Sequence, residues 1–70
     1  MKFHIMDQSG HSTLEFSKDE TTQAMEKFHA LIGDRYTAAT RKAGQTDYAA
    51  IKDGKQAQDE TLFVPALQGG

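Results

Sequence analysis

Residues 59–65, DETLFVP, form the most strand-like segment of this 70-residue chain. From Thr61 to Pro65 the residues on both alternating faces are largely apolar, which is the pattern of a strand covered on each side. Pro65 has no amide hydrogen and therefore indicates where regular strand pairing ends. The segment predicts a central strand around which the rest of the chain is arranged.

Two alternating segments near the N-terminus predict a β-hairpin. Phe3 and Ile5 share one face of residues 2–6, and residues 12–17 alternate in the same way. The link between them, residues 7–11, is rich in residues that form turns. Two such segments around a turn are typical of a hairpin with one buried face.

Residues 18–32 carry the clearest helical pattern. Ser17 and Glu20 fit a capping box, in which each side chain binds the backbone N–H of the other residue. Gly33 is expected to end the helix in a left-handed conformation. Apolar residues recur through the segment at spacings of three, four and seven, namely Ala24, Met25, Phe28, Leu31 and Ile32.

Residues 34–58 allow two interpretations. Residues 36–42 and 48–52 are rich in alanine, and helix propensity alone would make each a short helix. Only Tyr48 and Ile51 lie at a useful helical spacing, so neither segment has a clean apolar stripe. We favour two short strands, because a sheet that includes them accommodates the central strand better.

The order of elements predicts an α+β domain. A hairpin, a helix, one or two short strands and an apolar strand give a mixed sheet of four to five strands (ββαβ(β)β) packed on one main helix. This arrangement resembles the ubiquitin-like β-grasp fold, in which the last strand lies beside the first. Residues 1–70 are expected to form a single domain with a small core, since a chain of this length buries only about 60% of its unfolded surface.

The composition excludes several classes of protein. Eight basic and ten acidic residues give a net charge of −2, unlike the basic surface of a nucleic-acid-binding protein. The absence of cysteine excludes disulfides, zinc thiolate sites and thiol nucleophiles. No apolar run is long enough for a signal peptide or a membrane span. We therefore expect a cytoplasmic protein without a nucleic-acid or membrane partner.

The body of the chain carries no enzyme motif. His4, His11 and His29 do not have the spacing of metal ligands, and the glycines form neither a phosphate-binding loop nor a dinucleotide fingerprint. We expect no metal and no cofactor. Five basic residues after the helix could face an anion, although a solvated loop region is the favoured interpretation. These residues are Arg35, Arg41, Lys42, Lys52 and Lys55.

The last twelve residues, DETLFVPALQGG (residues 59–70), resemble the C-terminus of the small β-grasp sulfur carriers. These carriers are relatives of ubiquitin and include the small subunit of molybdopterin synthase and the sulfur carrier of thiamine biosynthesis. An acidic pair, an apolar strand, a proline, an aliphatic residue and two glycines follow one another in the same order. The matching residues are Asp59, Glu60, Leu62, Phe63, Pro65, Leu67, Gly69 and Gly70.

The resemblance implies a carrier protein and not an enzyme. An ATP-dependent adenylating enzyme of the ubiquitin-activating type would adenylate the Gly70 carboxylate. A sulfur donor would then convert it to a thiocarboxylate, and the sulfur would pass to an acceptor enzyme in cofactor biosynthesis. Residues 68–70 would form a flexible C-terminal tail. Gly69 and Gly70 have no Cβ atom and could enter a narrow channel in the partner.

The resemblance also places partner binding at the tail and its root. Phe63, Pro65 and Leu67 would form an apolar anchor, because exposed apolar patches often bind other proteins. Gln68 would extend the reach of the tail. For Phe63 the alternative is that it only covers the second face of the sheet. The alternative function is a ubiquitin-like interaction module or assembly factor in which the two glycines do no chemistry.

Overall fold

The N-terminal hairpin is confirmed. The computed structural model describes residues 1–7 and 9–66, and in it β1 (Lys2–Asp7) pairs antiparallel with β2 (Gly10–Glu15). Phe3 and Ile5 are buried on one face of β1. The second strand begins and ends two residues earlier than predicted. Phe16 still packs against the core from beyond its end.

The helix begins with a tighter turn than predicted. A 3₁₀ turn, η1 (Lys18–Glu20), precedes α1 (Thr21–Gly33). The backbone N–H of Ser17 donates to Glu20 Oε1 at 2.9 Å, as expected for a capping box. This hydrogen bond stabilises the ionised carboxylate and lowers the pKa of Glu20.

The prediction for Gly33 is wrong. Gly33 is the last residue of α1, and the left-handed residue is Arg35, with a φ of 69°. The backbone N–H of Asp34 donates to the carbonyl oxygens of Ala30 and Leu31, which satisfies the last turn of the helix without a left-handed residue at position 33. The chain reverses direction two residues later than the glycine suggests.

Residues 34–58 contain strands, as favoured from the sequence. β3 (Tyr36–Arg41) pairs antiparallel with the short β4 (Ala49–Ile51), and a 3₁₀ turn, η2 (Gly54–Gln56), follows. The alternating residues Ala38 and Thr40 are buried. Because their pairing partners come from other parts of the chain, local helix propensity does not decide the structure here.

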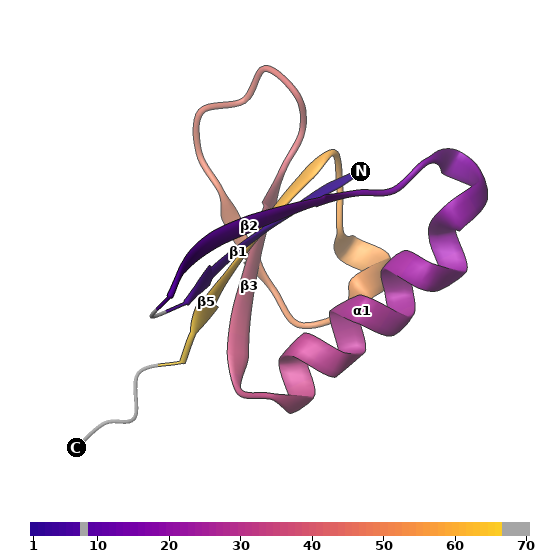
Figure 1. Ribbon diagram of the computed structural model, residues 1–70. Helices are drawn as coiled ribbons and strands as arrows, with labels where there is room; N and C mark the ends of the chain where they lie inside the picture. The colour runs from indigo at the N-terminus through magenta and orange to yellow at the C-terminus, as the bar shows by residue number, and fades with distance from the viewer. Residues whose placement is uncertain (8, 67–70) are drawn as a thin grey trace.

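The five strands form one mixed sheet with the order β2-β1-β5-β3-β4. β5 (Glu60–Pro65) is central, parallel to β1 and antiparallel to β3. Figure 1 shows α1 crossing one side of this sheet. The architecture is therefore α+β, with a mixed five-stranded sheet and one main helix, and it is compatible with a β-grasp.

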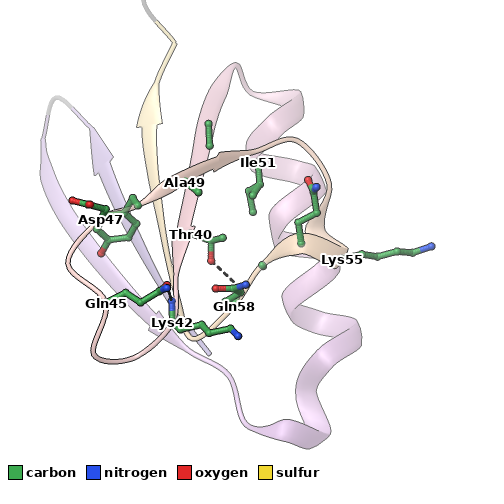
Figure 2. Close-up of a pocket in the computed structure, with 12 residues that line it drawn as sticks. Thr40, Lys42, Gln45, Asp47, Ala49, Ile51, Lys55 and Gln58 are labelled. Carbon is green, nitrogen blue, oxygen red and sulfur yellow. Dashed lines mark hydrogen bonds between the residues drawn. The ribbon is translucent and has the colours of Figure 1, made fainter.

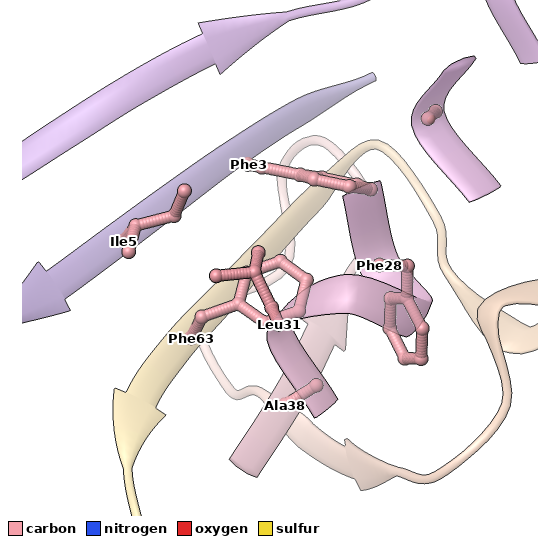
Figure 3. Close-up of a cluster of buried hydrophobic side chains, with 7 residues drawn as sticks. Phe3, Ile5, Phe28, Leu31, Ala38 and Phe63 are labelled. Carbon is pink, nitrogen blue, oxygen red and sulfur yellow. The ribbon is translucent and has the colours of Figure 1, made fainter. Parts of the chain in front are cut away.

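Three phenylalanines form the centre of the core between α1 and the sheet (Figure 3). Phe3, Phe28 and Phe63 are all fully buried. The Phe63 ring centroid lies 5.0 Å from that of Phe3 and 5.4 Å from that of Phe28, in edge-to-face geometry. Such pairs add to the free energy gained by burying the apolar area itself.

Two threonines are buried beside this core. Thr40 Oγ1 donates to the carbonyl oxygen of Glu60 at 2.9 Å and accepts from the N–H of Gln58 at 2.8 Å. Because a hydroxyl group has one hydrogen, the Thr61 hydroxyl must be the donor in its 3.2 Å contact with Thr40 Oγ1. The pair connects β3 to both ends of the turn that leads into β5.

The prediction that β5 is covered on both faces is wrong for the described residues. Thr61 and Phe63 face α1 and are buried, but Val64 on the other face is 36% exposed. No described element packs on that second face. The central strand is thus covered by α1 on one side only.

Candidate functional site

The uncovered face of the sheet, here called the open face, has no element of the described residues packed on it. Strand alternation and register define its members, because residues two apart in a strand share a face. They come from all five strands, namely Lys2, His4, Met6, His11, Thr13, Glu15, Thr37, Ala39, Arg41, Ala50, Glu60, Leu62 and Val64.

Glu60 organises one end of the open face. Its Oε1 lies 3.0 Å from His4 Nε2, and its Oε2 lies 3.0 Å from Arg41 Nη2 and 3.2 Å from Arg41 Nε. A carboxylate only accepts, so His4 Nε2 is the donor to Glu60, and His4 Nδ1 lies 3.3 Å from the Thr13 hydroxyl oxygen. This network joins β2, β1, β5 and β3 across the face.

The electrostatic effect on Glu60 follows from these contacts. The hydrogen bond from His4 lowers the pKa of the Glu60 carboxyl most strongly. Burial, the next largest effect, raises it, and the charge and hydrogen bonds of Arg41 lower it again, so the pKa lies below its ordinary value. Arg41 also stacks over the ring of Tyr48, with 4.8 Å from Cζ to the ring centroid. The charges of this end are satisfied within the protein.

The other end of the open face is apolar. Ile5 pairs with Phe63 in the register of β1 and β5, and the next residue of each strand, Met6 and Val64, faces outward. Met6 is 42% exposed and Val64 is 36% exposed. With the half-buried Ala39 and Leu62 they form what we call the apolar patch, comprising Met6, Ala39, Leu62 and Val64.

The end of β5 is fixed to the start of β3 beside the apolar patch. The backbone N–H of Ala66 donates to the carbonyl oxygen of Arg35 at 2.8 Å, and the Thr37 hydroxyl donates to the carbonyl oxygen of Val64 at 3.2 Å. Pro65 is exposed between these two contacts and has no N–H of its own. The chain is therefore held in place up to Ala66.

The structure places the residues of the predicted partner-binding site differently from one another. Phe63 is wrong as a partner-binding residue, because it faces α1 and is fully buried in the core. Pro65 is exposed next to the patch, so its position agrees with the expected anchor, but its binding role stays a prediction. Leu67, Gln68, Gly69 and Gly70 lie outside the described residues.

Sequence reasoning missed Met6 and Val64 as exposed apolar residues. The signal was present for Met6, because the same alternation that places Phe3 and Ile5 inside places Met6 outside. For Val64 the pattern misleads, because apolar residues on both faces of β5 are typical of a strand that is buried on both sides.

The histidines do not form a metal site in the described part of the chain. His4 belongs to the Glu60 network, and His11 and His29 are exposed on different elements. Residues 1–7 and 9–66 contain no group of three or more His, Asp or Glu side chains with the geometry of a metal site. Over the same residues, no helix has the length and apolarity to cross a bilayer.

Comparisons with known proteins do not assign the site. No family model, curated protein or solved structure gives a significant match to the chain. The functional argument therefore depends on the open face, the end of β5 and the chemistry of the residues that follow it.

Proposed function

We propose that this protein is a ubiquitin-like β-grasp carrier whose reactive group is the carboxyl group of Gly70. A partner enzyme of the ubiquitin-activating type would adenylate this group, and a sulfur donor would convert it to a thiocarboxylate for sulfur transfer in cofactor biosynthesis. The protein itself would supply no catalytic side chain. Its part is to bind its partners and to present Gly69 and Gly70.

One observation carries the proposal. The hydrogen bond from the N–H of Ala66 to the carbonyl oxygen of Arg35, here called the Ala66 clamp, fixes the end of β5 beside the apolar patch. The chain therefore leaves β5 next to an exposed apolar surface of the kind that binds other proteins. The mixed five-stranded sheet with one main helix is also compatible with a β-grasp domain. A carrier needs an exposed apolar surface for partner binding near the residues that lead to its carboxyl group.

The chemistry is ordinary acyl activation. A carboxylate is a poor electrophile, so an oxygen of the Gly70 carboxylate would attack the α-phosphorus of ATP, and pyrophosphate would leave. The terminal sulfur of a persulfide would then attack the acyl carbon and release AMP. A thiol that cleaves the resulting sulfur–sulfur bond would leave the thiocarboxylate on Gly70. All catalytic groups for these steps would come from the partners.

The experiment is intact-mass spectrometry of the chain after incubation with an adenylating enzyme of this type, ATP and a persulfide donor. The expected result is a mass increase equal to the replacement of one oxygen by sulfur. Deletion of Gly69 and Gly70 should abolish the increase and leave the thermal midpoint nearly unchanged. No increase with any of several candidate enzymes, or unfolding caused by the deletion, would contradict the proposal.

A matched pair of variants tests the role of the apolar patch. Val64→Glu places a charge in the patch, whereas Thr22→Glu places the same charge on the exposed side of α1, across the sheet. We expect Val64→Glu to slow the modification strongly and Thr22→Glu to leave it unchanged. Equal rates in the two variants would remove the patch from the binding surface.

A second candidate function is a ubiquitin-like interaction module or assembly factor without chemistry at Gly70. The observation in its favour is that Met6 and Val64, two large apolar residues, are exposed on the same face of the sheet. This function predicts a stable complex that Val64→Glu breaks, and that deletion of Gly69 and Gly70 does not affect.

A further inference from the structure

A cavity of about 760 Å³ lies at the end of the sheet opposite to the Ala66 clamp. Its walls are the end of β3, the loop of residues 42–48, β4, and the segment of residues 55–58 (Figure 2). The volume is in the range of sites for small molecules, about 300–1,000 Å³. The hydrogen bond from the N–H of Gln58 to Thr40 Oγ1, at 2.8 Å, holds the outer segment against the sheet.

Two glutamine side chains line the cavity, and backbone hydrogen bonds to their Oε1 atoms leave their NH₂ groups as donors. Gln45 Oε1 accepts from the backbone N–H of Lys42 at 2.9 Å. Gln56 Oε1 accepts from the N–H groups of Lys52 and Asp53 at 3.3 and 3.4 Å. Because backbone donors hold both oxygens, the NH₂ end of each amide is identified and can only donate. In the described part of the chain neither NH₂ group donates to a protein acceptor.

The charges around the cavity also favour an anion. Lys42 and Lys55 line it from different walls, and the ion pairs among the described residues involve neither of them. Figure 2 shows Lys55 extending outward from η2, so its ammonium group belongs to the rim. Asp47 is the carboxylate among the lining residues, and its side chain points away from Thr40 in the same view.

We infer that this cavity binds a small molecule through an oxyanion, either a phosphate or a carboxylate group. An oxyanion only accepts hydrogen bonds, which suits the donor-only NH₂ group of either glutamine. The ammonium groups of Lys42 and Lys55 add positive charge around the cavity, and hydrogen bonds from such groups to an oxyanion are shorter and stronger than neutral ones. The sequence-based alternative of an anion-facing patch thus applies to Lys42 and Lys55, whereas Arg41 is engaged with Glu60 on the open face.

The test is a titration of the full chain, followed by ¹H–¹⁵N NMR, with inorganic phosphate, AMP and citrate in turn. Sodium chloride at matched ionic strength is the reference. The expected result is saturable shifts of the side-chain NH₂ signals of Gln45 and Gln56 with at least one of the probes. The probe that binds most tightly distinguishes a phosphate from a carboxylate ligand. No saturable shift of these signals with any probe would overturn the inference.

Gln45→Glu and Gln56→Glu sharpen the test, because each keeps the oxygen that accepts from the backbone and replaces the NH₂ donor. Each should weaken binding by about tenfold or more, as expected for the loss of a hydrogen bond to a charged group. Gln23→Glu makes the same change of charge on exposed α1 and is the matched control. Lys42→Gln removes a charge without touching either amide and should also weaken binding. Equal weakening in Gln23→Glu and Gln45→Glu would show a general charge effect and refute the site.

Discussion

The backbone N–H of Ala66 donates to the carbonyl oxygen of Arg35 at 2.8 Å, so the end of β5 is tied to a residue in the left-handed conformation. Arg35 has a φ of 69°, which is uncommon for a residue with a side chain. The turn that closes α1 and the clamp that holds the end of β5 therefore share one residue. A substitution at Arg35 should therefore affect both the end of α1 and the end of β5.

Arg35→Gly is expected to stabilise the protein. Glycine adopts a left-handed conformation without the clash of a Cβ atom, so the free energy of unfolding should rise by about 1 kcal/mol. Urea denaturation followed by circular dichroism measures the change. Arg35→Ala is the control, since it removes the guanidinium group but keeps the strain, and it should remain near the wild-type value. A lower stability of Arg35→Gly would contradict the assignment of strain to this residue.

Thr40→Val and Thr61→Val should differ although both remove one buried hydroxyl group. Thr40→Val leaves the N–H of Gln58 and the carbonyl of Glu60 without their partner, so we expect a loss of at least about 2 kcal/mol. Thr61→Val removes only the contact with Thr40 and should cost less than about 1 kcal/mol. Urea denaturation measures both losses. Equal losses in the two variants would show that the additional hydrogen bonds of Thr40 do not add to stability.

Glu60→Gln should change the acid sensitivity of the fold. The pKa of Glu60 lies below its ordinary value of 4.5 in the folded protein. Its contribution to stability is therefore complete above the ordinary pKa and is lost as the pH falls through the folded-state pKa. The amide that replaces the carboxyl group does not titrate, so the variant should be less stable at neutral pH and lose less on acidification.

Urea midpoints between neutral pH and about pH 3 measure this difference. Glu26→Gln, on the exposed surface of α1, is the matched control and should follow the wild type. A Glu60→Gln variant whose midpoints run parallel to the wild type at every pH would contradict the role given to His4 and Arg41.

Substitutions at two neighbouring residues of β5 should have different effects on stability, because the two side chains lie on opposite faces of the sheet. Phe63→Leu leaves a cavity between the buried rings of Phe3 and Phe28 and should lower the free energy of unfolding by more than about 1 kcal/mol. Val64→Thr keeps the side-chain shape on the open face and should stay within about 0.5 kcal/mol of the wild type. A large loss in Val64→Thr would mean that the open face is covered in the native protein.

The faces of the strands could be predicted from the sequence, but not which face of β5 stays open. Alternation identifies Phe3 and Ile5 as one set because the residues between them are polar or long. In β5 the residues on both sides are apolar, so alternation does not distinguish Phe63 from Leu62. One helix covers only one face, and only the tertiary arrangement shows that Phe63 is on that side.

The remaining differences also depend on contacts that local patterns do not encode. Gly33 has the residue type of a left-handed helix end, but the strand that follows determines that the chain turns at Arg35. Ala38 has the propensity of a helical residue, but it pairs with Phe63 on one side and Ile51 on the other. The cavity with Gln45 and Gln56 is formed by two loop segments together with the end of β3 and β4, and hydrogen bonds across loops have no periodic signal.

The central position of β5 has a consequence for synthesis of the protein. β1 and β3 do not pair with each other, so without residues 60–65 the described sheet would be two separate two-stranded ribbons. Isolated ribbons of this kind are marginal in water. Phe3 and Phe28 then lack the ring of Phe63, their shared neighbour in the core. We therefore expect the described sheet to complete only after β5 has been synthesised, and its pairing with the distant β1 to be a slow step.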